Sequence, residues 1–434
     1  MNTTKHNITN TAEPIKQGYK KTSVGVIPED WSVKIFGECF KHLKAYTFSR
    51  NQLNYVEKKN AIYNIHYGDI HSTFPRNILD VKKDIDLIPI IISSELEAPE
   101  LLKDGDLIMA DASEDYEGIG QSIELINVGD KRIVSGTHTF PLRPVEKFAP
   151  KYAGYIFSNY NTHKEIKKIA TGISVYGISK SNIAKIQLPI PPLPEQKAIA
   201  DCLSTWDKGI EKLSALIASK KEQKKGLMQG IFSGKLKVEN GELIQAKEGE
   251  NFLKDWKKVR INEISKLGRG RVINKKEIES NLGIYPVYSS QTTNNGIFGY
   301  LNTYDFEGEY ITWTTDGVNA GSIFYRTGRF NCTNVCGTVK LRKGYDYYFV
   351  KSALDRVAER YVSRTLANPK LMNGVFGTIE ILIPSYDEQR TITKVLMVVD
   401  KEIELLEKRL EAFKIQKKGL MQVLLTGTKR LVES

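Results

Sequence analysis

Apolar residues recur at alternating steps of four and three positions in two stretches, one after Pro192 and one after Ser385. This is the heptad spacing of helices that pair along an apolar stripe. Each stretch runs to a glycine, Gly234 or Gly427, and its roughly 40 residues would form a helix about 60 Å long. Ser385 with Glu388 predicts a capping box at the start of the second helix. The expected core positions of the helix pair are Ile199, Leu203, Trp206, Ile210, Leu213, Ile217, Ile392, Leu396, Val399, Ile403, Leu406, Leu410 and Phe413.

The two stretches are copies of each other, aligned without a gap at a constant offset of 193 residues, and both contain the run QKKGLMQ. An Asp-Trp pair precedes each copy: Trp31 lies 164 residues before Glu195, and Trp256 lies 132 residues before Glu388. The strand-like runs GDLIMA and THTFPLR in the first half also resemble GEYITW and CGTVKLR in the second. The chain is therefore an internal repeat whose helices stayed alike while the segments between them diverged.

A single amphipathic helix of this length cannot bury its apolar stripe alone, so the two helices are expected to pack on each other. Antiparallel packing fits the connectivity, because the first helix leads into the second globular segment and the second helix must return. The prediction is an antiparallel coiled coil with one globular domain at each end of a rod.

The segments between the helices are rich in short β-like runs with Gly, Asn and Asp turns, such as KDIDLIPIII and GSIFYRTGRF. The predicted fold class is α+β, with two mixed α/β domains, two long helices and a pseudo-two-fold repeat. The predicted divisions are an N-terminal extension (1–22), a first domain (23–190), a central spacer helix (191–234), a linker (235–249), a second domain (250–383), and a C-terminal spacer helix with its tail (384–434).

Composition agrees with a multidomain globular protein: 434 residues, 41% of them apolar and 26% charged. The net charge of +12 and the isoelectric point near 9.2 favour an anionic partner, of which nucleic acid is the commonest. The first residues are polar and the apolar runs are short, so neither a secretory signal nor a membrane span is expected. Four cysteines suit a reducing compartment, and the expected location is cytoplasmic.

The sequence lacks the motifs of a catalyst. The run GIFSGKL has one residue too few between its glycines for a P-loop, and Leu236 replaces the magnesium-binding Ser or Thr. Asn368 and Pro369 are followed by Lys370, without the aromatic that would stack a flipped base in an amino-methyltransferase. No cofactor loop, nucleophile motif or zinc-ligand spacing is present, so we expect neither catalysis nor a bound metal.

Residues suited to DNA reading lie on the loops of both domains. Arg and Lys suit guanine, Asn and Gln suit adenine, and basic residues beside glycines suit phosphates. Each loop by itself is more often an ordinary turn. The candidates are Tyr67, Asp69, His71, Ser93, Ser94, His138, Arg269, Arg271, Lys275, Tyr288, Ser290, Gln291, Asn294, Asn295, Thr314, Asp316 and Asn334.

Lysines recur at equivalent positions of the two helices. They fit either a solvated helix face or a repeated surface that meets a repeated partner, and the repeat favours the second interpretation. Together with the helix openings, the partner-docking candidates are Glu195, Gln196, Lys224, Lys225, Glu388, Gln389, Lys417 and Lys418.

The duplicated pattern resembles a known family. PPLPEQ with a heptad helix and KKGLMQGIFSGK, then DEQ with a second such helix and KKGLMQVLLTGTKR, is similar to the specificity subunit of type I restriction-modification enzymes, as is the lead-in YKKTSVGVIPEDW. The second helix opens on SYDEQ instead of a proline-rich leader, a departure that puts the equivalence of the two docking ends in doubt.

The resemblance implies a sequence-specific DNA-binding subunit without catalysis of its own. Each of its two target-recognition domains would read one half of a bipartite asymmetric site in double-stranded DNA, and the helices would set the distance between the halves. The implied partners are two modification subunits, which bind S-adenosylmethionine and methylate adenine, and restriction subunits that use ATP and Mg²⁺. The target sequence, the spacer length and the oligomeric state stay open.

Two alternatives compete with this interpretation. A recognition subunit of a fused methyltransferase-nuclease system would show the same chemistry with different partners. A coiled-coil scaffold protein would explain the helices, but neither the two divergent domains nor the charge.

Overall fold

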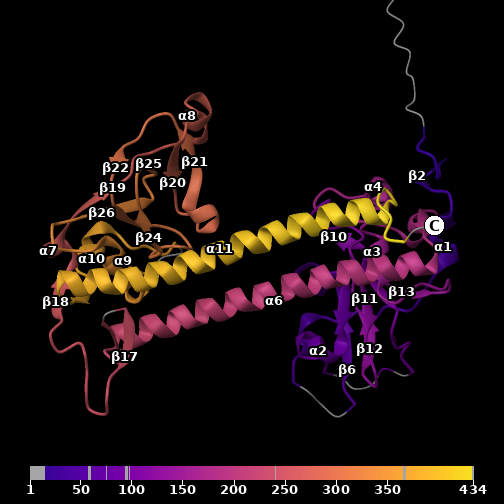
Figure 1. Cartoon of the computed structure of the whole chain (residues 1–434), viewed down its shortest axis with the longest axis horizontal. Coiled ribbons are helices and arrows are strands. Elements are labelled where there is room, and N and C mark those ends of the chain that lie inside the picture. Colours follow the sequence, from indigo (N-terminus) through magenta and orange to yellow (C-terminus); the bar gives the residue numbers. More distant parts are fainter. Residues whose placement is uncertain are drawn as a thin grey trace, which may run out of the picture. The chain divides into compact units, whose positions relative to one another are not determined.

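The computed structural model describes residues 15–56, 60–74, 76–92, 96, 98–239, 241–364 and 368–432. The chain divides into two compact units: unit 1 contains residues 1–214 and 409–434, and unit 2 contains residues 215–408. Two long helices, α6 (Leu193–Phe232) and α11 (Tyr386–Leu425), each contribute one part to unit 1 and the other part to unit 2 (Figure 1).

Unit 1 is a mixed domain on the first part of α6 and the last part of α11. Its short helices are α1 (Phe36–Cys39), α2 (Val81–Asp84), α3 (Tyr152–Ile156), α4 (Tyr160–Ile169) and α5 (Lys180–Ile183), with the helical turns η1 (Arg50–Gln52), η2 (Asp69–Thr73) and η3 (Ile85–Leu87). Its strands are β1 (Tyr19–Thr22), β2 (Gly25–Pro28), β3 (Ser32–Ile35), β4 (Phe40–His42), β5 (Leu53–Asn54), β6 (Ile62–Ile65), β7 (Ile78–Asp80), β8 (Ile90–Ile91), β9 (Leu107–Ala110), β10 (Ala112–Ser113), β11 (Ser122–Ile126), β12 (Arg132–Ser135), β13 (Thr139–Pro144), β14 (Tyr176–Gly177) and β15 (Gln187–Ile190).

The strands of unit 1 form a five-stranded sheet, β4-β13-β9-β11-β7, and a four-stranded sheet, β12-β6-β8-β5. The pair β15-β3 connects the start of the unit to the segment that enters α6. One core joins Trp31, Leu107 and Tyr155 of the domain to Leu203 of α6 and Leu424 of α11. The sheet is thus anchored directly on both helices.

Unit 2 repeats this plan with fewer elements. Its strands are β16 (Leu236–Glu239), β17 (Glu242–Gln245), β18 (Lys257–Arg260), β19 (Ser265–Arg269), β20 (Tyr285–Tyr288), β21 (Ile297–Leu301), β22 (Phe306–Glu307), β23 (Tyr310–Thr314), β24 (Ile323–Arg326), β25 (Arg329–Cys332), β26 (Cys336–Leu341) and β27 (Glu380–Ile383). Its short helices are α7 (Ile261–Ile264), α8 (Lys275–Ser280), α9 (Tyr347–Asp355) and α10 (Asn373–Gly377), with the turns η4 (Thr293–Gly296) and η5 (Ala358–Tyr361).

Two four-stranded sheets of unit 2, β19-β26-β23-β24 and β21-β20-β25-β22, correspond to the two larger sheets of unit 1, and β18-β27 corresponds to β15-β3. The weak sequence echoes fall on matching strands. GDLIMA and THTFPLR overlap the paired strands β9 and β13, and GEYITW and CGTVKLR overlap the paired strands β23 and β26. The segment 235–249, predicted as a linker, contains the antiparallel hairpin β16-β17.

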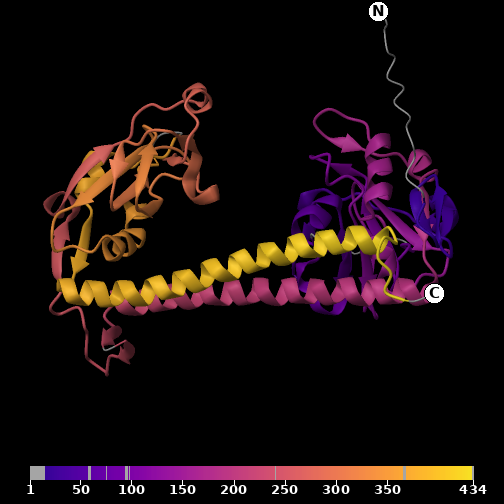
Figure 2. The same cartoon turned by 45° about the horizontal axis from the view of Figure 1, so that its top comes forward.

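The helices pack antiparallel within each unit, which confirms the predicted fold class. In unit 1 the rings of Trp206 and Phe413 make an edge contact with centroids 5.4 Å apart. In unit 2 Lys220 pairs with Glu402 and Lys224 pairs with Asp400, so position numbers rise along one helix as they fall along the other (Figure 2). All thirteen predicted core positions are buried or half-buried.

The helix ends show which local predictions were correct. Gly234 and Gly427 follow the last turns with φ of +74° and +71°, the left-handed conformation that glycine adopts without strain. Ser385 Oγ accepts a hydrogen bond from the Glu388 backbone N–H at 3.3 Å. The Glu388 carboxylate accepts instead from Trp256, so the predicted reciprocal half of the capping box is replaced by a contact with the domain.

Candidate nucleic-acid interface and partner surface

Three predicted reader residues of unit 1 come together at its surface. The Tyr67 ring makes edge contacts with His71 and His138, with centroids 6.1 and 5.5 Å away. His138 is exposed, has a φ of +54°, and its Nδ1 lies 3.4 Å from an oxygen of Asp111. Burial raises the pKa of Asp111, and the neighbouring His138 opposes that shift. Both ring nitrogens of His71 lie 3.1 Å from acceptors inside the domain, on Gln121 and Ala112. The cluster therefore offers the exposed imidazole of His138 and an aromatic face, groups that can contact base edges and phosphates.

A fourth candidate of unit 1, Asp69, does not join this surface. Asp69 is 5% exposed and accepts a hydrogen bond from the backbone N–H of His66, so its carboxylate caps a turn inside the domain. Ser93 and Ser94 lie outside the described residues.

Unit 2 gathers a group around Arg269. The guanidinium of Arg269 donates to the carbonyl of Asn334 at 2.5 Å and to the carboxylate of Asp316 at 3.1 Å. Lys370 lies 3.9 Å from the other oxygen of Asp316. Arg269 Nη2 also donates to Thr315 at 3.2 Å, so within the described residues Nη1 is the nitrogen left to contact a base edge or a phosphate.

A second basic group lies beside it. Arg271 pairs with Glu277 at 2.6 Å and with Asp305 at 3.0 Å, while Lys275 is exposed at the first position of α8. Two carboxylates therefore balance the charge of Arg271, and Lys275 presents a cation on a short helix.

The loop after β20 carries four further candidates. Ser290 accepts a hydrogen bond from Asn319 through its carbonyl, and Gln291 donates to the carbonyl of Ile297. Asn294 and Asn295 are exposed and left-handed, with φ of 49° and 51°. Asparagine tolerates this conformation better than other non-glycine residues, and here it leaves two amides at the tip of the loop.

The remaining candidates of unit 2, Tyr288 and Thr314, are buried, with relative exposures of 9% and 1%. Beneath the loop lies Arg326, which the sequence gave no reason to select. Its guanidinium lies 3.6 Å from the ring centroid of Tyr288 and 4.4 Å from that of Phe324.

Arg326 is 2% exposed and donates through Nε to Thr312 at 3.3 Å, but Nη1 has no hydrogen-bond partner and no carboxylate lies within 4 Å among the described residues. A buried cation without an acid is costly, which makes Arg326 a candidate for a functional role. An isolated arginine at a strand end carries no motif that could have identified it.

Glu195 and Glu388 open the two helices and bind the tryptophans that precede each domain. Trp31 Nε1 donates to Glu195 at 2.8 Å, and Trp256 Nε1 donates to Glu388 at 3.3 Å. In unit 1, Arg430 also pairs with Glu195 at 2.5 Å. These contacts span the separations of 164 and 132 residues visible in the sequence repeat.

The glutamines that follow them, Gln196 and Gln389, also bind the domain beside each helix. Gln196 accepts from the Ala149 backbone N–H and Gln389 from that of Asp346, each at 2.9 Å, and both are 1% exposed. Because Glu195, Gln196 and Gln389 are buried and hydrogen-bonded internally, the structure does not support their prediction as partner-docking residues. They attach each domain to its helix.

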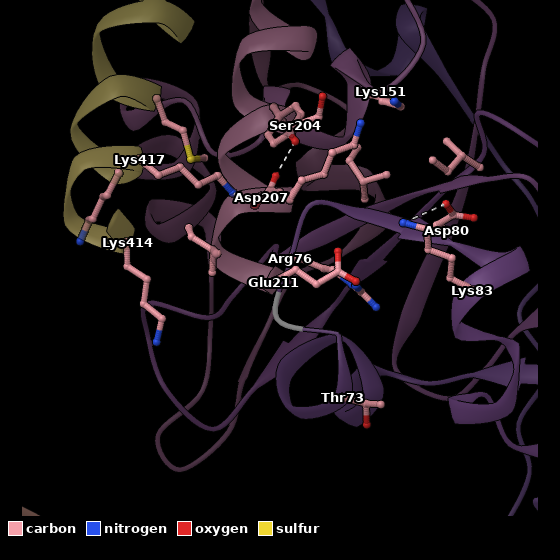
Figure 3. Close-up of a pocket in the computed structure, with 17 residues that line it drawn as sticks. Thr73, Arg76, Asp80, Lys83, Lys151, Ser204, Asp207, Glu211, Lys414 and Lys417 are labelled. Carbon is pink, nitrogen blue, oxygen red and sulfur yellow. Dashed lines mark hydrogen bonds and ion pairs between the residues drawn. The ribbon is translucent and has the colours of Figure 1, made fainter. Parts of the chain in front are cut away.

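The predicted docking lysines line cavities. The unit 1 pocket has a volume of about 540 Å³ between the domain and the two helices (Figure 3). In Figure 3, Lys417 of α11 points toward Asp207 of α6, with which it forms an ion pair, and the Tyr155 hydroxyl donates to the same carboxylate at 2.5 Å. Its other lining residues include Arg76, Lys83, Lys151, Lys208, Lys414, Lys418 and Met421.

Unit 2 contains a cavity at the matching place, with a volume of about 500 Å³. We call these two cavities the lysine pockets. Here Lys224 pairs with Asp400 at 2.5 Å, as Lys417 pairs with Asp207 in unit 1. The unit 2 pocket is lined by Lys221, Lys224, Lys225, Met228, Gln229, Asp355, Arg356 and Arg360.

Metal and membrane chemistry find no support in the described part of the chain. No group of three or more His, Cys, Asp or Glu side chains there could hold a metal ion. Cys332 and Cys336 are buried free thiols. Among the same residues, none of the helices combines the length and apolarity that crossing a bilayer requires.

A repeated helix support and two divergent domains with basic loops define the architecture of a modular DNA-recognition protein. The sequence profile of the type I restriction modification DNA specificity domain matches the chain twice, at residues 28–219 and 253–414. Because these matches cover most of the chain, the protein belongs to the family of type I restriction-modification specificity subunits.

Named relatives agree with this assignment. A putative type I restriction enzyme specificity subunit of Methanocaldococcus jannaschii is 26% identical, over 96% of this chain and 97% of its own length. A putative type I specificity subunit of Mycoplasma pneumoniae is 34% identical, over 53% of this chain and 92% of its own length. The crystal structure of a type I restriction-modification S subunit from M. genitalium shares the fold, with a TM-score of 0.55 at 16% identity, over 91% of this chain and 96% of that chain.

Proposed function

We propose that this chain is the sequence-specific DNA-recognition subunit of a type I restriction-modification complex and has no catalytic activity of its own. Its recognition domains, residues 23–190 and 250–383, each read one half of a bipartite asymmetric site. The observation that carries the proposal is that the two domains present different loop chemistry on repeated helix supports. The repeated helices hold both domains in the same way, and the different loops allow each domain to recognise a different DNA sequence.

Different side chains are available to read each half-site. In unit 1 the reader is the Tyr67, His71 and His138 cluster, and in unit 2 it is the Arg269 group with the loop that ends in Asn294 and Asn295. Arginine favours guanine and asparagine favours adenine in the major groove. The unit 2 half-site should therefore contain both bases.

The paired helices set the distance between the half-sites and dock two modification subunits, which supply S-adenosylmethionine-dependent methylation. Restriction subunits join this assembly with ATP and Mg²⁺. The relatives described above are named as type I subunits, which favours these partners over a fused methyltransferase-nuclease. A coiled-coil scaffold is not favoured, because the family match includes both globular domains.

The first experiment purifies the chain with the modification subunit of the same system and methylates a random DNA library. Sequencing should return one bipartite site with an adenine in each half. Exchange of residues 250–383 for those of another family member should change one half only. Recovery of no bipartite site, or a change in both halves after the exchange, would contradict the proposal.

The helix spacing has its own test. Deleting seven residues from each long helix shortens it by about 10 Å, which corresponds to roughly three base pairs of duplex. The preferred spacer should contract while both half-sites stay the same. An unchanged spacer would show that the helices do not set the distance.

A further inference from the structure

The two most exposed large apolar side chains among the described residues belong to different units. Ile173 of unit 1 is 94% exposed, and Val318 of unit 2 is 87% exposed. A single exposed apolar side chain is common on protein surfaces and by itself indicates no function. These two differ from the others because each lies beside the reading groups of its own unit.

In unit 1, Ile173 lies in a tight hairpin formed by residues 171–177. Thr171 and Gly177 close the hairpin through two backbone hydrogen bonds of 2.9 and 2.8 Å. Gly172 has a φ of +135°, and a Cβ atom there would collide with the carbonyl oxygen of Val175. The hairpin is therefore tightly closed, and Ile173 is held in solvent on a short, constrained loop.

A single segment, residues 111–113, contacts both this hairpin and the reading cluster of unit 1. Its strand β10 pairs with β14 of the hairpin. The carbonyl oxygen of Ala112 lies 3.1 Å from His71 Nε2, and a carboxylate oxygen of Asp111 lies 3.4 Å from His138 Nδ1. The hairpin that carries Ile173 is thus next to the exposed imidazole of His138.

In unit 2, Val318 lies between the two reading groups. Two positions before it, the carboxylate of Asp316 accepts a hydrogen bond from Arg269 at 3.1 Å. Directly after it, the side-chain amide of Asn319 donates to the carbonyl of Ser290 at 2.9 Å, in the loop that follows β20. One short segment therefore connects the Arg269 group, Val318 and the reading loop.

The two side chains come from different loops but occupy the same region of the repeat. The matching strands β9 and β23 each lead into a segment that pairs with a later part of the domain, through β10 and β14 in unit 1 and through the Asp316–Lys370 bridge in unit 2. Ile173 belongs to the later partner in unit 1, and Val318 to the first segment in unit 2. Each unit thus adds one exposed apolar side chain where its reading groups gather.

The surroundings of both side chains favour base edges over a protein surface. Ile173 shares its hairpin with Val175, which is 53% exposed, and these two side chains are a small apolar surface compared with the 20 to 30 residues or so on each side of a stable protein interface. In the major groove, the methyl group of thymine is the one apolar group among hydrogen-bond donors and acceptors. An isolated apolar side chain among polar readers therefore complements thymine.

We propose that Ile173 and Val318 each contact the methyl group of a thymine in the half-site that their own domain reads. The inference rests on the proposed function and deepens it, because it names a base feature that each domain recognises. A half-site that contains an adenine for methylation also contains a thymine on the complementary strand. The contact would discriminate against cytosine, which lacks the methyl group and presents an amino group instead.

Ile173→Ala and Val318→Ala test the two contacts separately, in the complex of the full-length chain with the modification subunit. Because both side chains are exposed, their removal should leave the fold intact. The matched controls are Val145→Ala and Ile284→Ala, at residues that are 61% and 79% exposed. Val145 follows β13 at the end opposite His138, and Ile284 precedes β20 at the end opposite the reading loop.

The probes are duplexes that carry the bipartite site returned by the random library. In a second series, deoxyuridine, which lacks the methyl group, replaces one thymine at a time. Titration measures the affinity of each complex for each duplex, and light scattering counts the modification subunits bound per chain.

One deoxyuridine in each half-site should weaken the wild-type complex about fourfold, the effect of about one buried methyl group. Ile173→Ala should weaken binding by at least a similar factor and should become insensitive to the deoxyuridine in its own half-site, while the deoxyuridine in the other half still weakens binding. Val318→Ala should show the reverse pattern. Both control variants should behave like the wild type.

Each residue is judged by its own half-site. A variant that binds as tightly as the wild type, a wild type that tolerates every deoxyuridine, or a variant whose loss adds to that of every deoxyuridine would overturn the inference. Release of modification subunits by either variant would also overturn it, since the side chain would then be a partner contact. A wild-type complex that returns no bipartite site would instead contradict the proposed function.

Discussion

The two units share their attachment to the helices and differ in the charges that their domains bury. Each holds its Asp-Trp segment on the glutamate that opens a helix, through Trp31 and Glu195 or Trp256 and Glu388. On the strand that pairs with β9, unit 1 buries the carboxylate of Glu124. On the strand that pairs with β23, unit 2 buries the guanidinium of Arg326.

This difference shows which parts of the repeat remained constant. The glutamate openings and the lysine-aspartate pairs bind the helices in the same way in both units, so a change there would disturb the frame. The strands behind the reading loops tolerate buried charges of opposite sign. This difference fits the proposed function, in which the two domains read different half-sites.

Removing the glutamates that open the two long helices should cause the largest loss of stability, and the loss should be greater in unit 1 than in unit 2. Glu195→Ala removes the acceptor of Trp31 and one of the two acids that hold Arg430, which keeps Asp30. Loss of two hydrogen bonds to a buried carboxylate should cost unit 1 about 3 kcal/mol. Glu388→Ala removes one hydrogen bond from a half-buried group and should cost unit 2 about 1 kcal/mol. Hydrogen exchange measured on peptides of each unit separates the two. Equal losses would mean that Arg430 adds nothing.

The buried Glu124 should make the stability of unit 1 depend on pH. Its carboxylate accepts from the backbone N–H groups of Lys151 and Gly154 at 2.6 and 2.8 Å, yet burial raises its pKa to about 7. Because the folded pKa exceeds the unfolded value, the contribution is full below about pH 4.3 and falls as the pH rises through 7.

Between pH 5 and 8 the loss should amount to about 2 kcal/mol relative to Glu124→Gln, which cannot titrate. Urea unfolding at several pH values measures this difference, with hydrogen exchange to assign it to unit 1. The deciding quantity is the change in the free energy of unfolding with pH, because the substitution can also alter the absolute stability of the variant. Parallel curves for the two proteins would show that Glu124 does not titrate in this range.

Arg326→Met should give a smaller effect of opposite sign. The substitution loses a cation-π contact with Tyr288 worth about 2 kcal/mol, but it also removes a buried cation without an acid, which costs several kcal/mol. Unit 2 should therefore become more stable by about 1 kcal/mol. Hydrogen exchange of β24 and β25 measures the change. A destabilised variant would mean that stacking on the two rings outweighs the cost of burial.

Much of the frame could be predicted from the sequence because periodicity and repetition are local signals. The thirteen core positions of the helices follow from heptad spacing, and Gly234 and Gly427 mark the helix ends. The helix openings were harder to interpret. Glu388 has the spacing of a capping box, but its carboxylate accepts a hydrogen bond from Trp256 and does not cap the helix.

The reading surfaces could be predicted only as loops. Tyr67 and His138 are distant in sequence and meet because β12 pairs with β6. Asp69 and Thr314 lie in loop-like or strand-end segments that the fold buries, and no local signal distinguishes them from exposed neighbours. Arg326 depends on rings contributed by another strand, so its environment has no signature in the sequence around it.

The division of the chain into these units also sets the order in which they can complete folding during translation. Unit 2 is one continuous stretch, whereas unit 1 needs residues from 409 onward, which include the α11 turns that join its core and Arg430 that pairs with Glu195. Synthesis proceeds from the N-terminus, so every residue of unit 2 is made before unit 1 is complete. The first domain to be translated is consequently the last to complete its fold. Until the end of α11 has been synthesised, the part of the unit 1 core that packs on α11 stays uncovered.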